Sequence, residues 1–147
     1  MTIGVNVKVK TLVNFDRIKK SVHKMNISSI RHGSAYIRKI ARNSIKYRLK
    51  KRDSSLAGTP PHTHAKGKNM GIRKAIIYAV DQNDAVGVIG VGFSNLLDID
   101  KAHELGGWYK FSRYRETRFY PKRPFMLPAL NKASPKLPSF WESRLRK

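Results

Sequence analysis

Two histidines, His62 and His64, stand two residues apart in a polar, proline-rich stretch, and imidazole is a common metal ligand. A protein zinc site needs three or four converging ligands, each oriented by further hydrogen bonds. The chain contains no cysteine, so His103 and Glu104 are the remaining candidates for further metal ligands beside His62 and His64. We therefore expect ordinary loop histidines, with no metal ion and no cofactor.

Carboxylates and a histidine also gather in the acidic middle of the chain, where general acid–base chemistry would need a suitably placed pair. Asp98 with Asp100, or His103 with Glu104, are the pairs available, but neighbouring residues on a helix do not face each other. The glycines of residues 87–92 lie in a strand pattern and indicate close packing or a bulge, not a phosphate loop. The chain has no nucleophile elbow, Walker loop or His-Glu-x-x-His helix. We predict no catalytic residues and no enzyme.

Positive charge dominates the composition, because 31 lysines and arginines against 9 acidic residues give a formal net charge of +22. Such an excess attracts anionic partners. No acidic residue lies between Asp16 and Asp53, whereas five of the nine acids occur between Asp81 and Glu104 with a single lysine. The sequence therefore predicts separate basic and acidic surfaces on one subunit.

Helical periodicity extends over residues 15–47, and Asn14 or Asp16 can cap the first turn. Ser28 or Ser29 predicts a bend or break, after which a second helix would begin. Beyond that point apolar residues fall on one face and basic residues on the other. The basic face is a candidate partner surface, and it comprises Arg31, Arg38, Arg42 and Lys46.

Alternation of apolar and polar residues predicts a half-buried strand over residues 5–9. Two further strands, 72–80 and 85–91, flank the turn 81–84 and predict a hairpin. Residues 108–120 alternate aromatic and basic side chains and indicate a strand or an extended arm.

Short helices are expected over residues 96–105, where Gly106-Gly107 would end the first, over about 123–130, and over 138–145. Residues 50–69 contain a proline pair and glycines, which predict a long, flexible, extended loop that can reach a neighbouring subunit. The candidate contact residues of this loop are Pro60, Pro61, His62 and His64.

These elements predict a single α+β domain over residues 1–147, with an antiparallel sheet packed against a long basic N-terminal helix, short C-terminal helices and a long extended loop. With 40% hydrophobic residues, a chain of this length can bury a core. We expect no signal peptide and no membrane contact, because no apolar run approaches the roughly 20 residues that span a bilayer.

Several sequence blocks follow one another in a characteristic order from about Asn14 to the C-terminus. A basic helix leads into Ser-Ser-x-x-Gly-x-Pro-Pro-His-x-His, an Ile-Arg-Lys-Ala-Ile-Ile-Tyr-Ala-Val-Asp strand, a valine–glycine strand and His-Glu-Leu-Gly-Gly. The order closes with Arg-Pro-Phe-Met-x-Pro-Ala-Leu, the most specific block, and Leu-Pro-x-Phe-Trp. This order resembles the phage tail-completion family, the head–tail joining or neck proteins of long-tailed phages.

The resemblance implies a subunit that forms a ring, a hexamer, between the portal-proximal connector and the tail tube. Its partners would be further copies of itself, the neighbouring head-connector protein, and a tail-tube or tail-terminator protein. Contact with packaged DNA would be non-specific. The protein would be located in the neck of the virion, after assembly in the host cytoplasm.

A ring subunit needs two different complementary surfaces. The sequence predicts that the basic helix face and the acidic stretch form such a pair, with Arg38 and Arg42 of one copy facing Asp98 and Asp100 of the next.

Arg123, Phe125 and Met126 are further interface candidates, because Pro124 and Pro128 fix the backbone around them. The same apolar side chains would serve equally well as caps on the core.

Two other interpretations stay open. A basic nucleic-acid-binding protein with no virion role would use the basic helix and the aromatic–basic segment 108–123, although no helix-turn-helix or ribonucleoprotein signature is present. A small phage nuclease would use the histidines, and its cleavage would depend on a divalent metal ion.

Overall fold

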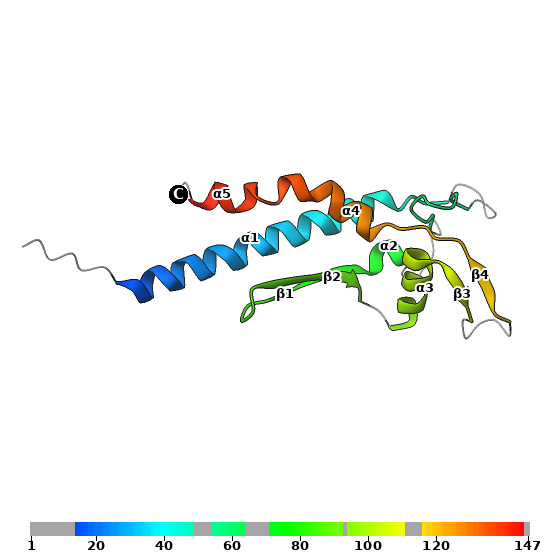
Figure 1. Cartoon of the computed structure of the whole chain (residues 1–147), viewed down its shortest axis with the longest axis horizontal. Helices are drawn as coiled ribbons and strands as arrows, with labels where there is room; N and C mark the ends of the chain where they lie inside the picture. The colour runs from blue at the N-terminus through cyan, green and yellow to red at the C-terminus, as the bar shows by residue number, and fades with distance from the viewer. Residues whose placement is uncertain (1–13, 49–53, 64–70, 93, 111–115, 146–147) are drawn as a thin grey trace, which may run out of the picture.

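The computed structural model describes residues 14–48, 54–63, 71–92, 94–110 and 116–145, and the side chains of residues 94–97 are left aside. The strand predicted over residues 5–9 lies outside these ranges. Figure 1 shows an elongated molecule, with helix α1 (Phe15–Ser44) along its length. The C-terminal helices lie on one side of α1 and a β-hairpin lies on another.

Helix α1 begins where the sequence predicts, and Asn14 is its N-cap. The Oδ1 atom of Asn14 accepts a hydrogen bond from the backbone N–H of Arg17 at 3.0 Å. This bond satisfies one of the free N–H groups of the first turn, which is the usual reason for asparagine at this position.

Of the break or bend predicted at Ser28 or Ser29, the break is wrong, because α1 is one continuous helix of 30 residues. The buried Ser29 does not cap a new helix; its hydroxyl donates to the carbonyl of Phe140 at 3.0 Å. Nearby, the indole N–H of Trp141 donates to Asn26 Oδ1 at 2.9 Å. The polar residues in this stretch therefore attach the C-terminal helix to α1.

The predicted hairpin is present, with β1 (Ile76–Asp81) antiparallel to β2 (Val86–Val91). Its first predicted strand begins four residues too early, because residues 72–75 form a helical turn, α2 (Ile72–Ala75). A helical turn places residues three apart on one side, so Ile72 and Ala75 both enter the core. The turn itself is held by Asp81, whose carboxylate accepts from the backbone N–H of Asn83 at 2.8 Å.

The hairpin packs closely on α1 at Gly87. A Cβ at this position would collide with the Ser34 hydroxyl and crowd Ile30, both on α1. The glycine of the valine–glycine strand thus has the packing role that the sequence indicates.

Helix α3 (Ser94–Leu105) ends at Gly106, which has a φ of +68°. A second small sheet follows, in which β3 (Gly107–Tyr109) pairs antiparallel with β4 (Arg118–Tyr120). The predicted strand or arm over residues 108–120 is therefore two short strands, and residues 111–115 between them lie outside the described part.

Two short helices, α4 (Met126–Ala133) and α5 (Ser139–Leu145), flank a 3-10 turn, η1 (Ser134–Lys136). The core forms where α1, α2, the hairpin and α4 meet. Its buried residues are Ala41, Ile45, Ile72, Ala75, Ile76, Val91, Phe125 and Ala129. The predicted α+β class and the packing of the long basic helix against the strands are confirmed.

Candidate interaction surfaces

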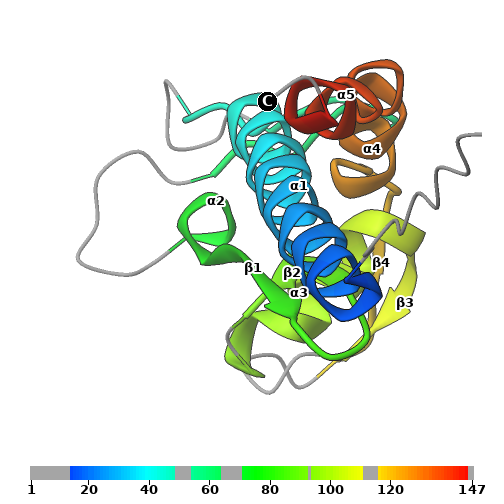
Figure 2. The ribbon, with the colours of Figure 1, turned by 90° about the vertical axis from the view of Figure 1, so that its left-hand side faces the viewer.

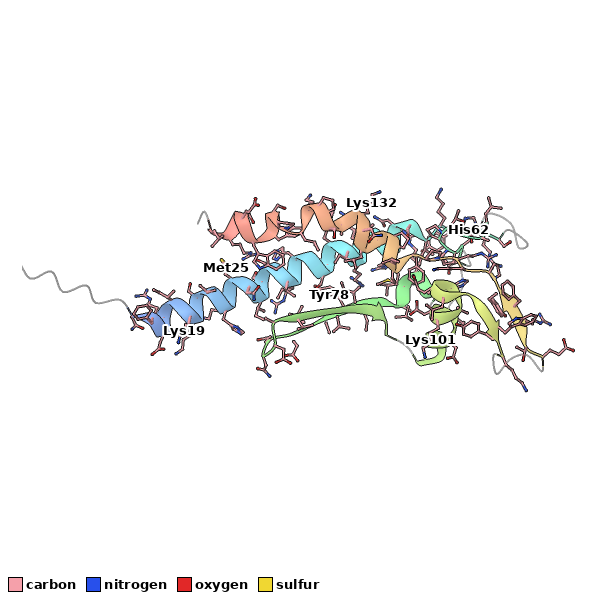
Figure 3. All side chains as sticks on the ribbon, in the orientation of Figure 1. Lys19, Met25, His62, Tyr78, Lys101 and Lys132 are labelled. Carbon is pink, nitrogen blue, oxygen red and sulfur yellow. The ribbon has the colours of Figure 1, made fainter. Side chains whose placement is uncertain are left out.

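The predicted basic face of α1 is only partly available to a partner. Arg31 is exposed and Arg42 is half-buried, whereas Lys46 is exposed but lies beyond α1, because the helix ends at Ser44 and does not reach residue 47 as predicted. Arg38 is engaged within the chain, since its Nε donates to the carbonyl of Ile76 at 2.8 Å and its guanidinium lies 5.9 Å from the ring centre of Tyr78. Figure 3 shows Tyr78 between the hairpin and α1. Part of the predicted stripe therefore fixes the hairpin to α1.

The start of α1 is more exposed than the predicted face. Every residue from Asn14 to Lys24 is exposed, and this projecting segment extends beyond the end of α5 and beyond the hairpin tip (Figure 1). It carries an apolar stripe and several cations, of which Lys19 is labelled in Figure 3. The apolar stripe comprises Phe15, Ile18 and Val22, and the cations are Arg17, Lys19, Lys20 and Lys24.

The two predicted acidic partners of the basic face differ in their surroundings. Asp98 is exposed, whereas Asp100 is half-buried and its Oδ1 has no hydrogen-bond partner among the described residues. Burial, and then the nearby Glu104, raise the pKa of Asp100 to about 6. Burial, and then Arg123 and Arg48, lower the pKa of His103 to about 4. The predicted pairing of these acids with Arg38 and Arg42 of another copy stays a prediction, but Arg38 and Asp100 are each turned toward their own chain.

The two shifted groups should make stability depend on pH in opposite directions. The raised pKa of Asp100 contributes stability below pH 3.8, and that contribution is lost as pH rises through 6. The lowered pKa of His103 contributes stability above pH 6.5, and that contribution is lost as pH falls through 4. Asp100→Asn should therefore raise the free energy of unfolding at pH 7 by about 1 kcal/mol, a value reduced for solvent screening of this half-exposed group.

Urea unfolding of Asp100→Asn, His103→Gln and the wild type between pH 7 and pH 4 checks this expectation. The higher free energy of unfolding of Asp100→Asn should fall to the wild-type value near pH 4. The free energy of unfolding of His103→Gln should instead rise relative to that of the wild type as the pH falls. Differences from the wild type that do not change with pH would contradict the assignment.

The predicted interface block at residues 123–126 is mostly internal. Phe125 is fully buried in the core, and Met126 packs against it. Arg123 is half-buried, and its Nε donates to the carbonyl of Ser55 at 3.0 Å. Of the two roles left open for these apolar side chains, the structure favours the one in the core.

Glu104 joins this block to α3. One carboxylate oxygen, Oε1, accepts from the backbone N–H of Phe125 at 2.8 Å and from that of Met126 at 2.6 Å. Phe125 stands at the N-cap of α4 but has no side chain that could accept these bonds, so Glu104 supplies the acceptor from another helix. The negative charge also lies at the positive end of α4.

The described half of the predicted loop, residues 54–63, contains no helix or paired strand beyond a single bridge from Thr63 to Tyr47. It is attached to its own chain, since Gly58 N–H donates to the carbonyl of Lys122 at 2.7 Å. Pro61 is fully buried.

Among the four candidate loop contacts, Pro60 and His62 are half-buried and His64 lies outside the described residues. The candidate residues that are described therefore offer a neighbour less surface than predicted, although Leu56 in the same segment is 78% exposed.

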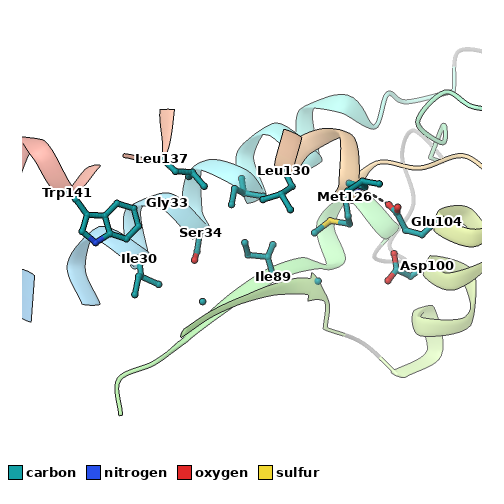
Figure 4. Close-up of a pocket in the computed structure, with 14 residues that line it drawn as sticks. Ile30, Gly33, Ser34, Ile89, Asp100, Glu104, Met126, Leu130, Leu137 and Trp141 are labelled. Carbon is teal, nitrogen blue, oxygen red and sulfur yellow. Dashed lines mark hydrogen bonds between the residues drawn. The ribbon is translucent and has the colours of Figure 1, made fainter. Parts of the chain in front are cut away.

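An open apolar groove of about 620 Å³ lies between α1, the hairpin and the C-terminal helices. Figure 4 shows Trp141 at one end, Asp100 and Glu104 at the other, and Ile89 and Leu130 between them. The sequence did not predict it, because its walls come from helices and strands that are distant along the chain.

A second unpredicted surface is the outer face of the hairpin, which points away from α1. The inner residues, such as Ile76 and Val91, are buried, whereas alternate residues point outward. The outward apolar residues are Ile77, Ala79, Val86 and Val88, and all are exposed.

The small β3–β4 sheet exposes an aromatic pair. Trp108 and Phe119 stand opposite each other with ring centres 5.6 Å apart, and they are 71% and 59% exposed. Arg118 directly precedes Phe119, and Lys110 follows Trp108 by two residues. The alternation over residues 108–120 in the sequence indicates this combination of rings and cations.

Within the described ranges, no group of three or more His, Asp or Glu side chains could hold a metal ion. None of the helices described is long and apolar enough to cross a membrane. Comparison of the chain with protein-family models, with curated proteins and with solved structures found no match in any of the three.

Proposed function

We propose that this chain is a structural subunit of a tailed-phage virion, which completes the tail or joins it to the head connector as a member of a ring and performs no catalysis. The observation that carries the proposal is the amount of apolar side chain left uncovered at separate places on a chain that already has a core. The projecting segment of α1 lies at one end of the molecule, the β3–β4 pair lies toward the other, and the hairpin lies along its flank (Figure 1). Apolar side chains that share one exposed face, as on the projecting segment and on the hairpin, favour association with a partner.

The motif blocks that resemble the tail-completion family support the proposal because they meet in space. The His-Glu-Leu-Gly-Gly block contributes Glu104, which bonds to the Arg-Pro-Phe-Met block at Phe125 and Met126. The Ser-Ser block contributes the Ser55 carbonyl, which accepts from Arg123. Three sequence blocks that are distant along the chain are thus joined by hydrogen bonds at one place in the fold.

The proposed partners follow from the resemblance and the charge. They are further copies of the chain in a hexameric ring, a head-connector protein, and a tail-tube or tail-terminator protein. A net charge of +22 favours acidic partners and weak, sequence-independent contact with packaged DNA. The site of action would be the neck of the virion, after assembly in the host cytoplasm.

Disruption of the gene in a phage that carries it is expected to leave filled heads and separate tails that do not join. A plasmid copy of the wild-type chain, or of Asn43→Asp as a control at an exposed position of α1, should restore joined particles. Electron microscopy and plaque counts measure both results. Normal yields of infectious, joined particles without the chain would contradict the proposal.

A basic nucleic-acid-binding protein without a virion role is the second candidate, and the exposed Trp108–Phe119 pair favours it. Stacking of bases on such rings contributes about 1–3 kcal/mol per base, and nearby cations contact phosphates. If this is the function, Trp108→Ala should weaken binding of single-stranded DNA about tenfold or more, with little change in its salt dependence. Fluorescence titration at several salt concentrations measures the affinity for single-stranded DNA, and an affinity that Trp108→Ala leaves unchanged would reject this candidate.

A further inference from the structure

The projecting segment of α1 (residues 14–24) has an apolar stripe that nothing in the described chain covers. Phe15, Ile18 and Val22 recur at intervals of three and four residues, so they lie on one side of the helix. Phe15 is 68% exposed, and the other two are about half exposed. A helix that leaves such a stripe in water has a surface suited to a partner.

The outer face of the hairpin is the other uncovered apolar surface with regular geometry. Ile77 on β1 and Val86 and Val88 on β2 point away from α1, and Val88 is 63% exposed. A two-stranded sheet is marginally stable by itself, and a helix commonly covers each apolar face. The inner face is covered by α1 of the same chain, whereas the outer face has no cover among the described residues.

These two surfaces do not meet within one chain. The stripe continues along α1 to Ser29 and Gly33, seven and eleven residues beyond Val22, and these residues contact the α5 region. The stripe therefore lies on the side of α1 that faces α5, while the outer hairpin face points away from α1 altogether (Figure 2). Pairing them requires two molecules.

Their charges are complementary. The stripe is accompanied by Arg17, Lys19, Lys20 and Lys24, with Asp16 as the single acid of the projecting segment. The hairpin contains no lysine or arginine, and its charges are the exposed Asp81 and Asp84 at the tip. The acidic tip disfavours nucleic acid as the occupant of the hairpin face and favours a basic helix.

We propose that the projecting segment of one copy packs its Phe15–Ile18–Val22 stripe on the outer hairpin face of the next copy, with its lysines beside Asp84. The contact joins two different surfaces, so it is heterologous, and repetition closes a ring or extends a filament. Closure of a ring strengthens the assembly further, because every subunit is then held by two such contacts. The closure of the contacts into a ring rests on the proposed function. The contact itself does not, because it is tested on the purified chain.

The test uses two variants that each remove one surface. Ile18→Asp with Val22→Asp alters the stripe, and Val88→Lys alters the hairpin face; all three positions are exposed, so circular dichroism should show an unchanged fold. Asn43→Asp on α1 and Asn131→Lys on α4 are controls that make the same types of charge change at exposed positions elsewhere. Sedimentation velocity over a wide concentration range measures association.

We expect the wild type and both controls to associate, and each surface variant to lose at least about tenfold in association constant. Mixing the two surface variants should then give a one-to-one heterodimer that grows no further, because one intact stripe and one intact hairpin face remain. A mixture that stays monomeric, a wild type that never associates, or surface variants that associate normally would each overturn the contact.

The phage experiment separates this contact from the proposed function. If joined particles require the chain but the surface variants still restore them, the contact is wrong and the function stands. If joined particles form without the chain, the function is wrong, whatever the heterodimer shows.

Discussion

Replacing Phe125 with alanine is expected to lower the free energy of unfolding by about 3–5 kcal/mol, the usual cost of truncating a buried phenylalanine. The ring is completely buried among Ala41, Ile45, Ile76 and other core residues of α1, α2 and the hairpin. Its removal would leave a cavity where four elements meet, and small domains have only about 5–15 kcal/mol of stability. Urea unfolding followed by circular dichroism should show a lower midpoint at an unchanged slope.

The matched control is Leu127→Ala, two residues further along the same motif. Leu127 is 56% exposed, so its truncation should change stability by less than about 1 kcal/mol. If Phe125→Ala instead kept the wild-type stability and lost only self-association, Phe125 would be an interface anchor and its burial in the core would lack energetic importance.

Phe125 also illustrates what the sequence could and could not predict. Helical and alternating patterns located α1, the hairpin and the short C-terminal helices, because each pattern depends on which side of one element faces the core. The sequence leaves the role of Phe125 between two prolines open, since a residue on a rigid turn can point inward or outward. The inward direction of its ring is set by the packing of α1, α2 and the hairpin against α4, which the local sequence does not show.

The candidate surfaces were predicted less well, for a related reason. Ile18 and Val22 have the spacing of a core-facing helix side, yet no described part of the chain covers them. Arg38 looked like part of a free basic stripe, but it bonds to the backbone of β1. Periodicity shows which side chains share a face; it does not show whether another element of the fold covers that face.

Removing the carboxylate of Glu104 is expected to have the second largest effect. Its Oε1 accepts from both Phe125 N–H and Met126 N–H, and these charge-assisted bonds hold the first turn of α4 against α3. Glu104→Ala leaves the N–H of the buried Phe125 and that of the half-buried Met126 without this acceptor, and hydrogen bonds to charged groups are worth about 1.5–3 kcal/mol each. Because water can replace part of the loss, we expect the free energy of unfolding to fall by about 2–3 kcal/mol, measured by urea unfolding at pH 7.

Glu104→Gln separates the acceptor from the charge. The amide oxygen can still accept from the N–H groups of Phe125 and Met126, so the loss should be about 1 kcal/mol, half or less of that in Glu104→Ala. The same substitution removes the negative charge that helps to raise the pKa of Asp100, so this pKa should fall below 6, as carboxyl-selective NMR titration would detect. Equal destabilisation by alanine and glutamine would mean that the charge, and not the acceptor, holds α4. An Asp100 pKa that does not move would show that the two carboxylates at the end of the groove are not coupled.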